Sequence, residues 1–220
     1  MPMSTASPAS TSVADEDLLR AQLYRLMGSL LAREPTGEVL AVIRGLQGDD
    51  SDLGRAFQKL AGQADKFGEE SVRREFLDLF IGVGRGELVP YGSYYLTGFL
   101  NEKPLAKLRN AMRDLGIERA DDVKEPEDNI GSLMEMMAGL IEGDFGTPLS
   151  HQEQKAFFDN HVGNWASYFF RDLSAAESSK FYKPVGEIGV LFMEIEKAAF
   201  EMAGEQQSTA GDQGGTSAAD

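Results

Sequence analysis

Residues 125–141 read EPEDNIGSLMEMMAGLI and combine a helix start signal with a long apolar helix face. Pro126 suits the first turn of a helix, which does not need the missing N–H. Glu125, Glu127 and Asp128 put negative charge beside the positive end of the helix dipole. The apolar face follows at spacings of three and four residues, at Ile130, Leu133, Met134, Met137, Leu140 and Ile141. This stretch predicts a helix that begins at Glu125 and buries that face in the core.

The same helical period extends outward from this stretch in both directions. It appears in Leu19, Leu23, Leu26, Met27 and Leu30, in Leu53, Phe57, Leu60, Ala61 and Ala64, and in Val185, Ile188, Leu191, Phe192, Ile195 and Ala199. Thr36 is placed to cap one helix, and Pro104 is placed to open another. Ser150 and Glu153 form a capping box. Behind the box, one predicted helix carries Phe157, His161, Trp165 and Phe169 at four-residue spacing.

Signals for β-structure are missing from the sequence. There is no sustained alternation of apolar and polar residues, and neither Asn-Gly nor Asp-Gly occurs as a hairpin turn. The sequence therefore predicts an all-α, single-domain bundle of about eight to nine or more helices.

Charge and composition limit the class of partner. The chain has 220 residues, with 21 Lys and Arg against 36 Asp and Glu, for a formal net charge of −15. Nucleic-acid phosphates attract basic surfaces, so this charge argues against a nucleic-acid partner. A basic or an apolar partner is compatible with it. The hydrophobic share of 42% is ordinary for a globular protein, so a packed core is expected.

Cysteine usage and the chain ends bear on the compartment. Cysteine is absent, which excludes disulfides, thiolate metal sites and cysteine nucleophiles. No apolar run approaches the roughly 20 residues that span a bilayer, and residues 1–12 lack the basic and apolar blocks of a secretory signal. We expect a cytoplasmic protein without stable membrane insertion, the alternative being an exported protein without its signal. Residues 1–14 and 204–220 have too little apolar surface to fold and are predicted to be disordered tails around a domain of residues 15–203.

A glycine-rich segment interrupts the helical pattern. Five of the eleven residues from Gly82 to Gly92 are Gly or Pro. Such a loop can cradle phosphate when it follows a strand and opens a helix. Here the preceding residues read as a helix, and no Gly-Lys-Ser or Gly-Lys-Thr follows. A structured connector is therefore the favoured interpretation.

The motifs of common enzymes are not found. Neither His151 nor His161 has a Glu three residues before it, as di-iron bundles require. Two His without Cys give little support for zinc, and there is no Gly-x-Ser-x-Gly elbow. His161 lies among aromatic residues and is better explained as a histidine at the edge of the core. We therefore expect no catalytic residues, no metal and no cofactor.

Three motifs in order resemble those of the TorD/DmsD family of redox-enzyme maturation chaperones. The first is residues 75–95, EFLDLFIGVGRGELVPYGSYY; the second is residues 125–129, EPEDN, followed by Leu133 and Met137; the third is Phe157, His161 and Trp165. The resemblance covers residues 15–200. In the second motif the family usually has His where this chain has Asn129, and Asn cannot carry a charge near neutral pH.

The resemblance implies an all-α chaperone rather than an enzyme. Such a protein binds the twin-arginine signal peptide and the apo form of a molybdopterin-containing oxidoreductase, and it holds back export until cofactor insertion and folding are complete. Homodimers, including domain-swapped ones, are known in the family. The net charge of −15 suits a peptide with a basic Arg-Arg region. An adaptor or structural subunit that binds another protein is the second hypothesis, and an enzyme on a helical scaffold is the third.

By resemblance, the binding groove would use residues from the first two motifs. They are Tyr91, Ser93, Tyr94, Tyr95, Glu125, Pro126, Asp128 and Asn129. For Tyr94 and Tyr95, packing of the loop explains their presence as well as binding does. Asp128 is explained either by partner contact or by capping of its own helix. Met134, like Leu133 and Met137, is assigned to the core rather than to the groove.

Overall fold

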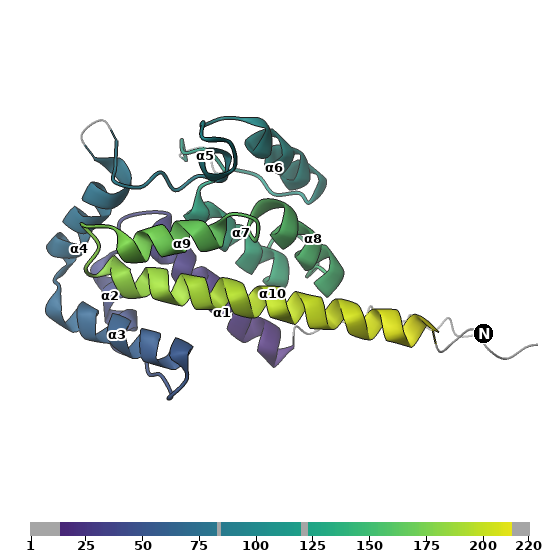
Figure 1. Ribbon diagram of the computed structural model, residues 1–220, viewed down its shortest axis with the longest axis horizontal. Coiled ribbons are helices and arrows are strands. Elements are labelled where there is room, and N and C mark those ends of the chain that lie inside the picture. The colour runs from purple at the N-terminus through teal and green to yellow at the C-terminus, as the bar shows by residue number, and fades with distance from the viewer. Residues whose placement is uncertain (1–13, 83–84, 120–122, 213–220) are drawn as a thin grey trace, which may run out of the picture.

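The computed structural model describes residues 14–82, 85–119 and 123–212, and every regular element in these ranges is helical (Figure 1). The predicted all-α class is therefore confirmed. The elements are α1 (Asp15–Leu31), α2 (Gly37–Arg44), α3 (Asp52–Lys66), α4 (Glu69–Phe76), the π-helical turn η1 (Leu77–Ile81), α5 (Gly92–Thr97), α6 (Lys103–Asp114), α7 (Ile130–Glu142), α8 (His151–His161), α9 (Ala166–Ala175) and α10 (Tyr182–Asp212).

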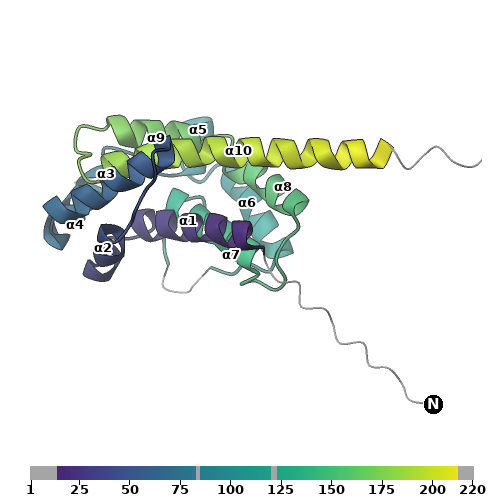
Figure 2. The same cartoon turned by 90° about the horizontal axis from the view of Figure 1, so that it is seen from below.

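The helices pack in two main layers. Helix α1 packs along α7, while α10 packs against α9 and α3, and Figure 2 shows the α9–α10 layer beside the α1–α7 layer. Glycine permits the close approach of α1 and α7, because a Cβ on Gly131 would lie 2.2 Å from the backbone nitrogen of Ala32. The apolar face of α7 is buried, so the assignment of Leu133, Met134 and Met137 to the core agrees with the structure.

A buried ion pair joins the two layers. The guanidinium of Arg20 on α1 donates to both carboxylate oxygens of Glu196 on α10, at 2.7 and 2.8 Å. The hydroxyl of Tyr24 donates to the same carboxylate at 2.9 Å. Because a buried carboxylate is stable only when its oxygens accept hydrogen bonds, this cluster fixes where α10 crosses α1.

Local capping signals formed as the sequence predicted. The Thr36 hydroxyl accepts from the amide of Val39 at the start of α2. Ser150 and Glu153 form the capping box of α8, with the Ser150 amide donating to the Glu153 carboxylate at 2.9 Å. Pro104 lies in the first turn of α6. These helix starts depend only on residues within one turn of each other.

The aromatic row was wrongly placed on one helix. Helix α8 ends at His161, and α9 begins at Ala166 with Trp165 as its N-terminal cap. The amide of Gly163 donates to the carbonyl of Phe158 at 2.7 Å, and this bond closes the end of α8. The Trp165 indole instead donates to the carbonyl of His161 at 2.8 Å and is buried. The four-residue spacing of these residues in the sequence is that of a continuous helix, so it gives no sign of the turn between α8 and α9.

Two glutamates of the first motif hold the loop between α9 and α10. The buried Glu75 carboxylate accepts the backbone amides of Lys180, Phe181 and Tyr182 at 2.7, 3.1 and 2.8 Å. The exposed Glu87 carboxylate accepts those of Glu177 and Ser178 at 2.6 and 3.0 Å. The motif therefore anchors the start of the C-terminal helix.

Helix α10 continues through residues 204–212, which the sequence analysis assigned to the C-terminal tail, and it extends past α8 (Figure 1). Gly84 and residues 1–13 and 213–220 lie outside the described residues. None of the described helices is both long enough and apolar enough to cross a membrane.

Candidate functional site

The first two motifs meet in the folded chain. The amide of Gly92 donates to the carbonyl of Asp128, and the amide of Ile130 donates to the carbonyl of Pro90, both at 2.9 Å. These bonds form an antiparallel bridge between Tyr91 and Asn129. Two segments that are more than 30 residues apart in the chain therefore lie side by side.

Asp128 caps a different helix from the predicted one. Helix α7 begins at Ile130, and its cap is Asn129, whose side-chain oxygen accepts from the amide of Gly131 at 2.8 Å. The prediction of a helix start at Glu125 was wrong because the bridge to Tyr91 keeps Asn129 extended. The Asp128 carboxylate turns to α5 and accepts from the amide of Ser93 at 2.6 Å. This bond satisfies one of the free amides at the start of α5.

The buried and exposed members of the predicted site have different tasks. Ser93, Asp128 and Asn129 expose 0, 3 and 7% of their surface, so their contacts are with the protein itself. Pro126 lies in the turn before α7, where its carbonyl accepts from the amide of Asn129 at 3.1 Å. These four residues hold the backbone of the site. The tyrosines and Glu125 keep part or all of their surface accessible to a ligand.

Carboxylates hold two of the three tyrosines. The Tyr91 hydroxyl donates to Glu125, and burial together with this carboxylate raises the pKa of the phenol. The Tyr95 hydroxyl donates to Asp172 on α9 at 2.8 Å, and burial and Asp172 raise its pKa as well. Both phenols therefore stay protonated and orient exposed carboxylates at the surface. A cationic group of a ligand could pair with those carboxylates.

Tyr94, which lies between Tyr91 and Tyr95 in the sequence, contacts a cationic side chain instead of a carboxylate. The guanidinium of Arg85 lies over its ring, 5.1 Å from the centroid, and donates to its hydroxyl at 2.6 Å. The Tyr94 ring meets that of Tyr95 edge to face, with centroids 6.1 Å apart. The tyrosine cluster thus has a fixed geometry.

The indole of Trp165 packs against α5. Tyr95 packs on Trp165 with ring centroids 5.4 Å apart. A Cβ on Gly92 would lie 3.0 Å from the indole nitrogen, so glycine lets the α5 backbone rest on the indole. Trp165 of the third motif therefore packs against residues 92–95 of the first motif.

Three exposed apolar residues lie next to the tyrosines and are not among the predicted site residues. Leu96, Phe99 and Leu100 are 41, 69 and 45% exposed, where α5 ends and the chain turns toward α6. Figure 1 shows α5 and α6 together at one side of the molecule. In the sequence, three large apolar residues among residues 96–100, next to Gly98, could have indicated this exposed surface. Exposed apolar groups gathered in one place mark interaction sites.

In the described ranges, no group of three or more His, Asp or Glu side chains could hold a metal ion. His161 lies half-buried against Phe157, and burial, aided by Lys107, lowers its pKa. A neutral imidazole at the edge of the core matches the structural interpretation of this residue.

Comparison with known proteins identifies relatives over most of the chain. The family model of the nitrate reductase delta subunit matches residues 46–171. Chaperone protein TorD of Vibrio cholerae serotype O1 is 25% identical over 199 residues, which cover 81% of this chain and 90% of the relative. Chaperone protein TorD of Photobacterium profundum is 27% identical over 202 residues, with coverage of 81 and 93%.

A solved structure has the same fold. It is a putative redox enzyme maturation protein from Archaeoglobus fulgidus, which superposes with a TM-score of 0.57 at 19% identity and covers 80% of this chain and 94% of its own.

Proposed function

This chain belongs to the nitrate reductase delta subunit family, and from that premise we propose that it is a maturation chaperone, not an enzyme, for a molybdopterin-containing oxidoreductase. Relatives named chaperone protein TorD support this assignment. In our proposal the chain acts in the cytoplasm. It binds the twin-arginine signal peptide and the apo form of its client, and it delays export until the cofactor is inserted and the client is folded.

The observation that carries the proposal is the pairing of residues 90–95 with residues 125–130. It brings Glu125 beside Tyr91 at the surface around α5, where Tyr95 also holds the exposed carboxylate of Asp172 on α9. A guanidinium pairs with carboxylates through parallel hydrogen bonds, so these groups suit the arginines of the signal. The net charge of −15 favours the approach of such a peptide at long range.

The apolar segment of the signal peptide needs an apolar surface next to the arginine site. Leu96, Phe99 and Leu100 offer one directly after the tyrosines. In this arrangement the arginines meet Glu125 and Asp172, and the apolar stretch continues toward α6. Asp128 and Asn129 act indirectly, because they hold the two segments that present these side chains.

Binding can be tested by titration with a synthetic signal peptide from a neighbouring molybdoenzyme. Trp165 is the only tryptophan of the chain and supports α5, so its fluorescence reports on the site. Calorimetry provides the affinity independently. We expect micromolar or tighter binding, and weaker binding of a peptide with Lys-Lys in place of Arg-Arg.

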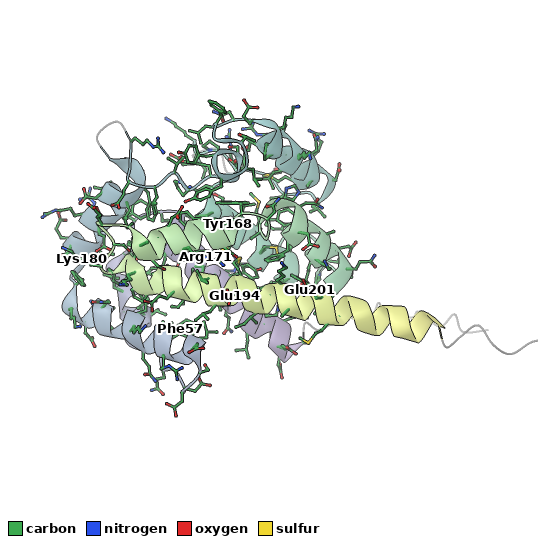
Figure 3. All side chains as sticks on the ribbon, in the orientation of Figure 1. Phe57, Tyr168, Arg171, Lys180, Glu194 and Glu201 are labelled. Atoms are coloured by element: carbon green, nitrogen blue, oxygen red, sulfur yellow. The ribbon has the colours of Figure 1, made fainter. Side chains whose placement is uncertain are left out.

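The double variant Glu125→Gln with Asp172→Asn removes both carboxylates and keeps the side-chain shapes. Each exposed carboxylate contributes about 0.5–1 kcal/mol, so the dissociation constant should rise roughly five- to thirtyfold. The matched control is Glu194→Gln with Glu201→Gln, which removes the same charge from α10 (Figure 3). Equal weakening in both double variants would reduce the site to a general effect of net charge, and no binding of any peptide would refute the proposed function.

A further inference from the structure

The exposed Arg85 pairs with a tyrosine rather than with a carboxylate. Several arginines in the described ranges, such as Arg25, Arg73 and Arg109, pair with carboxylates. Arg85 is exposed in a protein with many more acids than bases, yet the partner that the structure gives it is the phenol of Tyr94. Its guanidinium covers the ring and donates to the hydroxyl.

The Tyr94 ring already has a fixed orientation in which a guanidinium can stack on it. Its edge-to-face contact with Tyr95 fixes its orientation, and Tyr95 is held in turn by Asp172 and Trp165. A planar guanidinium stacks on such a ring and reaches its hydroxyl at the same time, whereas a lysine ammonium has no planar face to stack. The contact that Arg85 makes is therefore one that selects arginine.

We propose that Tyr94 is an arginine-binding platform of the peptide site and that Arg85 occupies it in the free protein. This inference rests on the proposed function, since it names how that site distinguishes arginine from lysine. One arginine of the incoming peptide takes the place of Arg85 on the ring. Arg85 thus acts as an internal competitor, and only a ligand that offers a guanidinium replaces the contact that is lost.

The test compares Arg85→Gln with the unchanged protein. An exposed cation–π contact corresponds to roughly a two- to fivefold change in affinity, so Arg85→Gln should tighten peptide binding by about that factor. The matched control is Arg171→Gln, because Arg171 lies over the ring of Tyr168 on α9, 5.8 Å from its centroid. Figure 3 shows this second pair. The control removes the same charge from a second arginine–tyrosine stack and should leave the affinity for the peptide unchanged.

Two probes separate this inference from the proposed function. The first is a full signal peptide, and the second is a capped Ser-Arg-Arg-Ala tetrapeptide followed by nuclear magnetic resonance up to its solubility limit. Each is compared with its Lys-Lys counterpart. Tyr94→Leu removes the ring and should abolish the preference for arginine in both probes, with thermal melts confirming that the variant is folded.

Each outcome decides one of the two claims. Tighter binding in Arg85→Gln, with Arg171→Gln unchanged, supports the platform. Equal or weaker binding in Arg85→Gln overturns it and leaves the proposed function intact. If the tetrapeptide follows the expected pattern while the full peptide does not bind, the platform stands and the proposed function fails. If neither probe binds any variant, both claims are refuted.

Discussion

Replacing Glu75 with Gln would measure how strongly one buried carboxylate fixes the C-terminal helix. One Glu75 oxygen accepts the amides of Lys180 and Tyr182, and the other accepts that of Phe181. A Gln side chain has only one acceptor oxygen, so in its better orientation its NH₂ group faces the Phe181 amide. One buried N–H then loses its partner, and the other two bonds lose the assistance of the negative charge.

The cost follows from these bonds. A buried N–H without a partner costs about 1–3 kcal/mol, and each of the two weakened bonds loses about 1 kcal/mol more. Relaxation of the loop reduces the sum, so we expect Glu75→Gln to lower the free energy of unfolding by about 3 kcal/mol. Urea unfolding followed by Trp165 fluorescence would show a midpoint lower by roughly 1 M.

Glu87→Gln is the matched control, because Glu87 also accepts two amides of the loop between α9 and α10 but is exposed to solvent. Water can replace its hydrogen bonds, so its loss should cost less than about 1 kcal/mol. Peptide affinity should stay unchanged in both variants that remain folded. A Glu75→Gln cost below about 1 kcal/mol, or no larger than that of Glu87→Gln, would refute this account of the anchor.

Three further predictions concern the site and its support. Trp165→Ala should cost about 3–5 kcal/mol because the indole is buried, and a solvent-like emission maximum for native Trp165 would contradict that placement. Asp128→Asn should destabilise the fold by about 1 kcal/mol, because the amide oxygen still accepts from Ser93 but without the negative charge, and it should weaken peptide binding as well; paired melts and titrations that show lost stability with intact affinity would limit Asp128 to capping α5. Burial raises the pKa of Glu127, but its bond to Arg109 outweighs this and leaves the pKa below 4.5, so the pair stabilises the fold above about pH 4.5 and that stability is lost at lower pH. The stability difference between the native protein and Arg109→Gln should therefore shrink in urea melts below that pH, and a constant difference would contradict the pair's role.

Several features of the chain could be predicted from residues close together in the sequence. The period of Leu133, Met134 and Met137 indicates a buried helix face, and the Ser150–Glu153 capping box indicates a helix start. Both signals arise within one or two helical turns, where side chains reach each other whatever the rest of the fold does. The first two motifs that resemble the family also contain the segments, residues 90–95 and 125–130, that meet at the site.

Other features depend on contacts between distant segments. Asp128 has the sequence context of a cap for its own helix, but the bridge between Tyr91 and Asn129 turns it to α5. Nothing near Glu75 indicates that it receives three amides from residues more than 100 positions away. The break before Trp165 is equally hidden, since its four-residue spacing is that of a continuous helix.

The difference between the features that the sequence predicted and those that only the tertiary structure decided has a physical origin. Helix formation and capping depend on backbone groups within four residues of each other, so the sequence by itself determined the all-α class and most helix positions. The partner of a buried carboxylate or a stacked guanidinium is whichever group the packed layers bring within hydrogen-bond distance. Only the tertiary structure therefore decided that Asp128 holds α5, that Glu75 anchors α10 and that Arg85 lies on Tyr94.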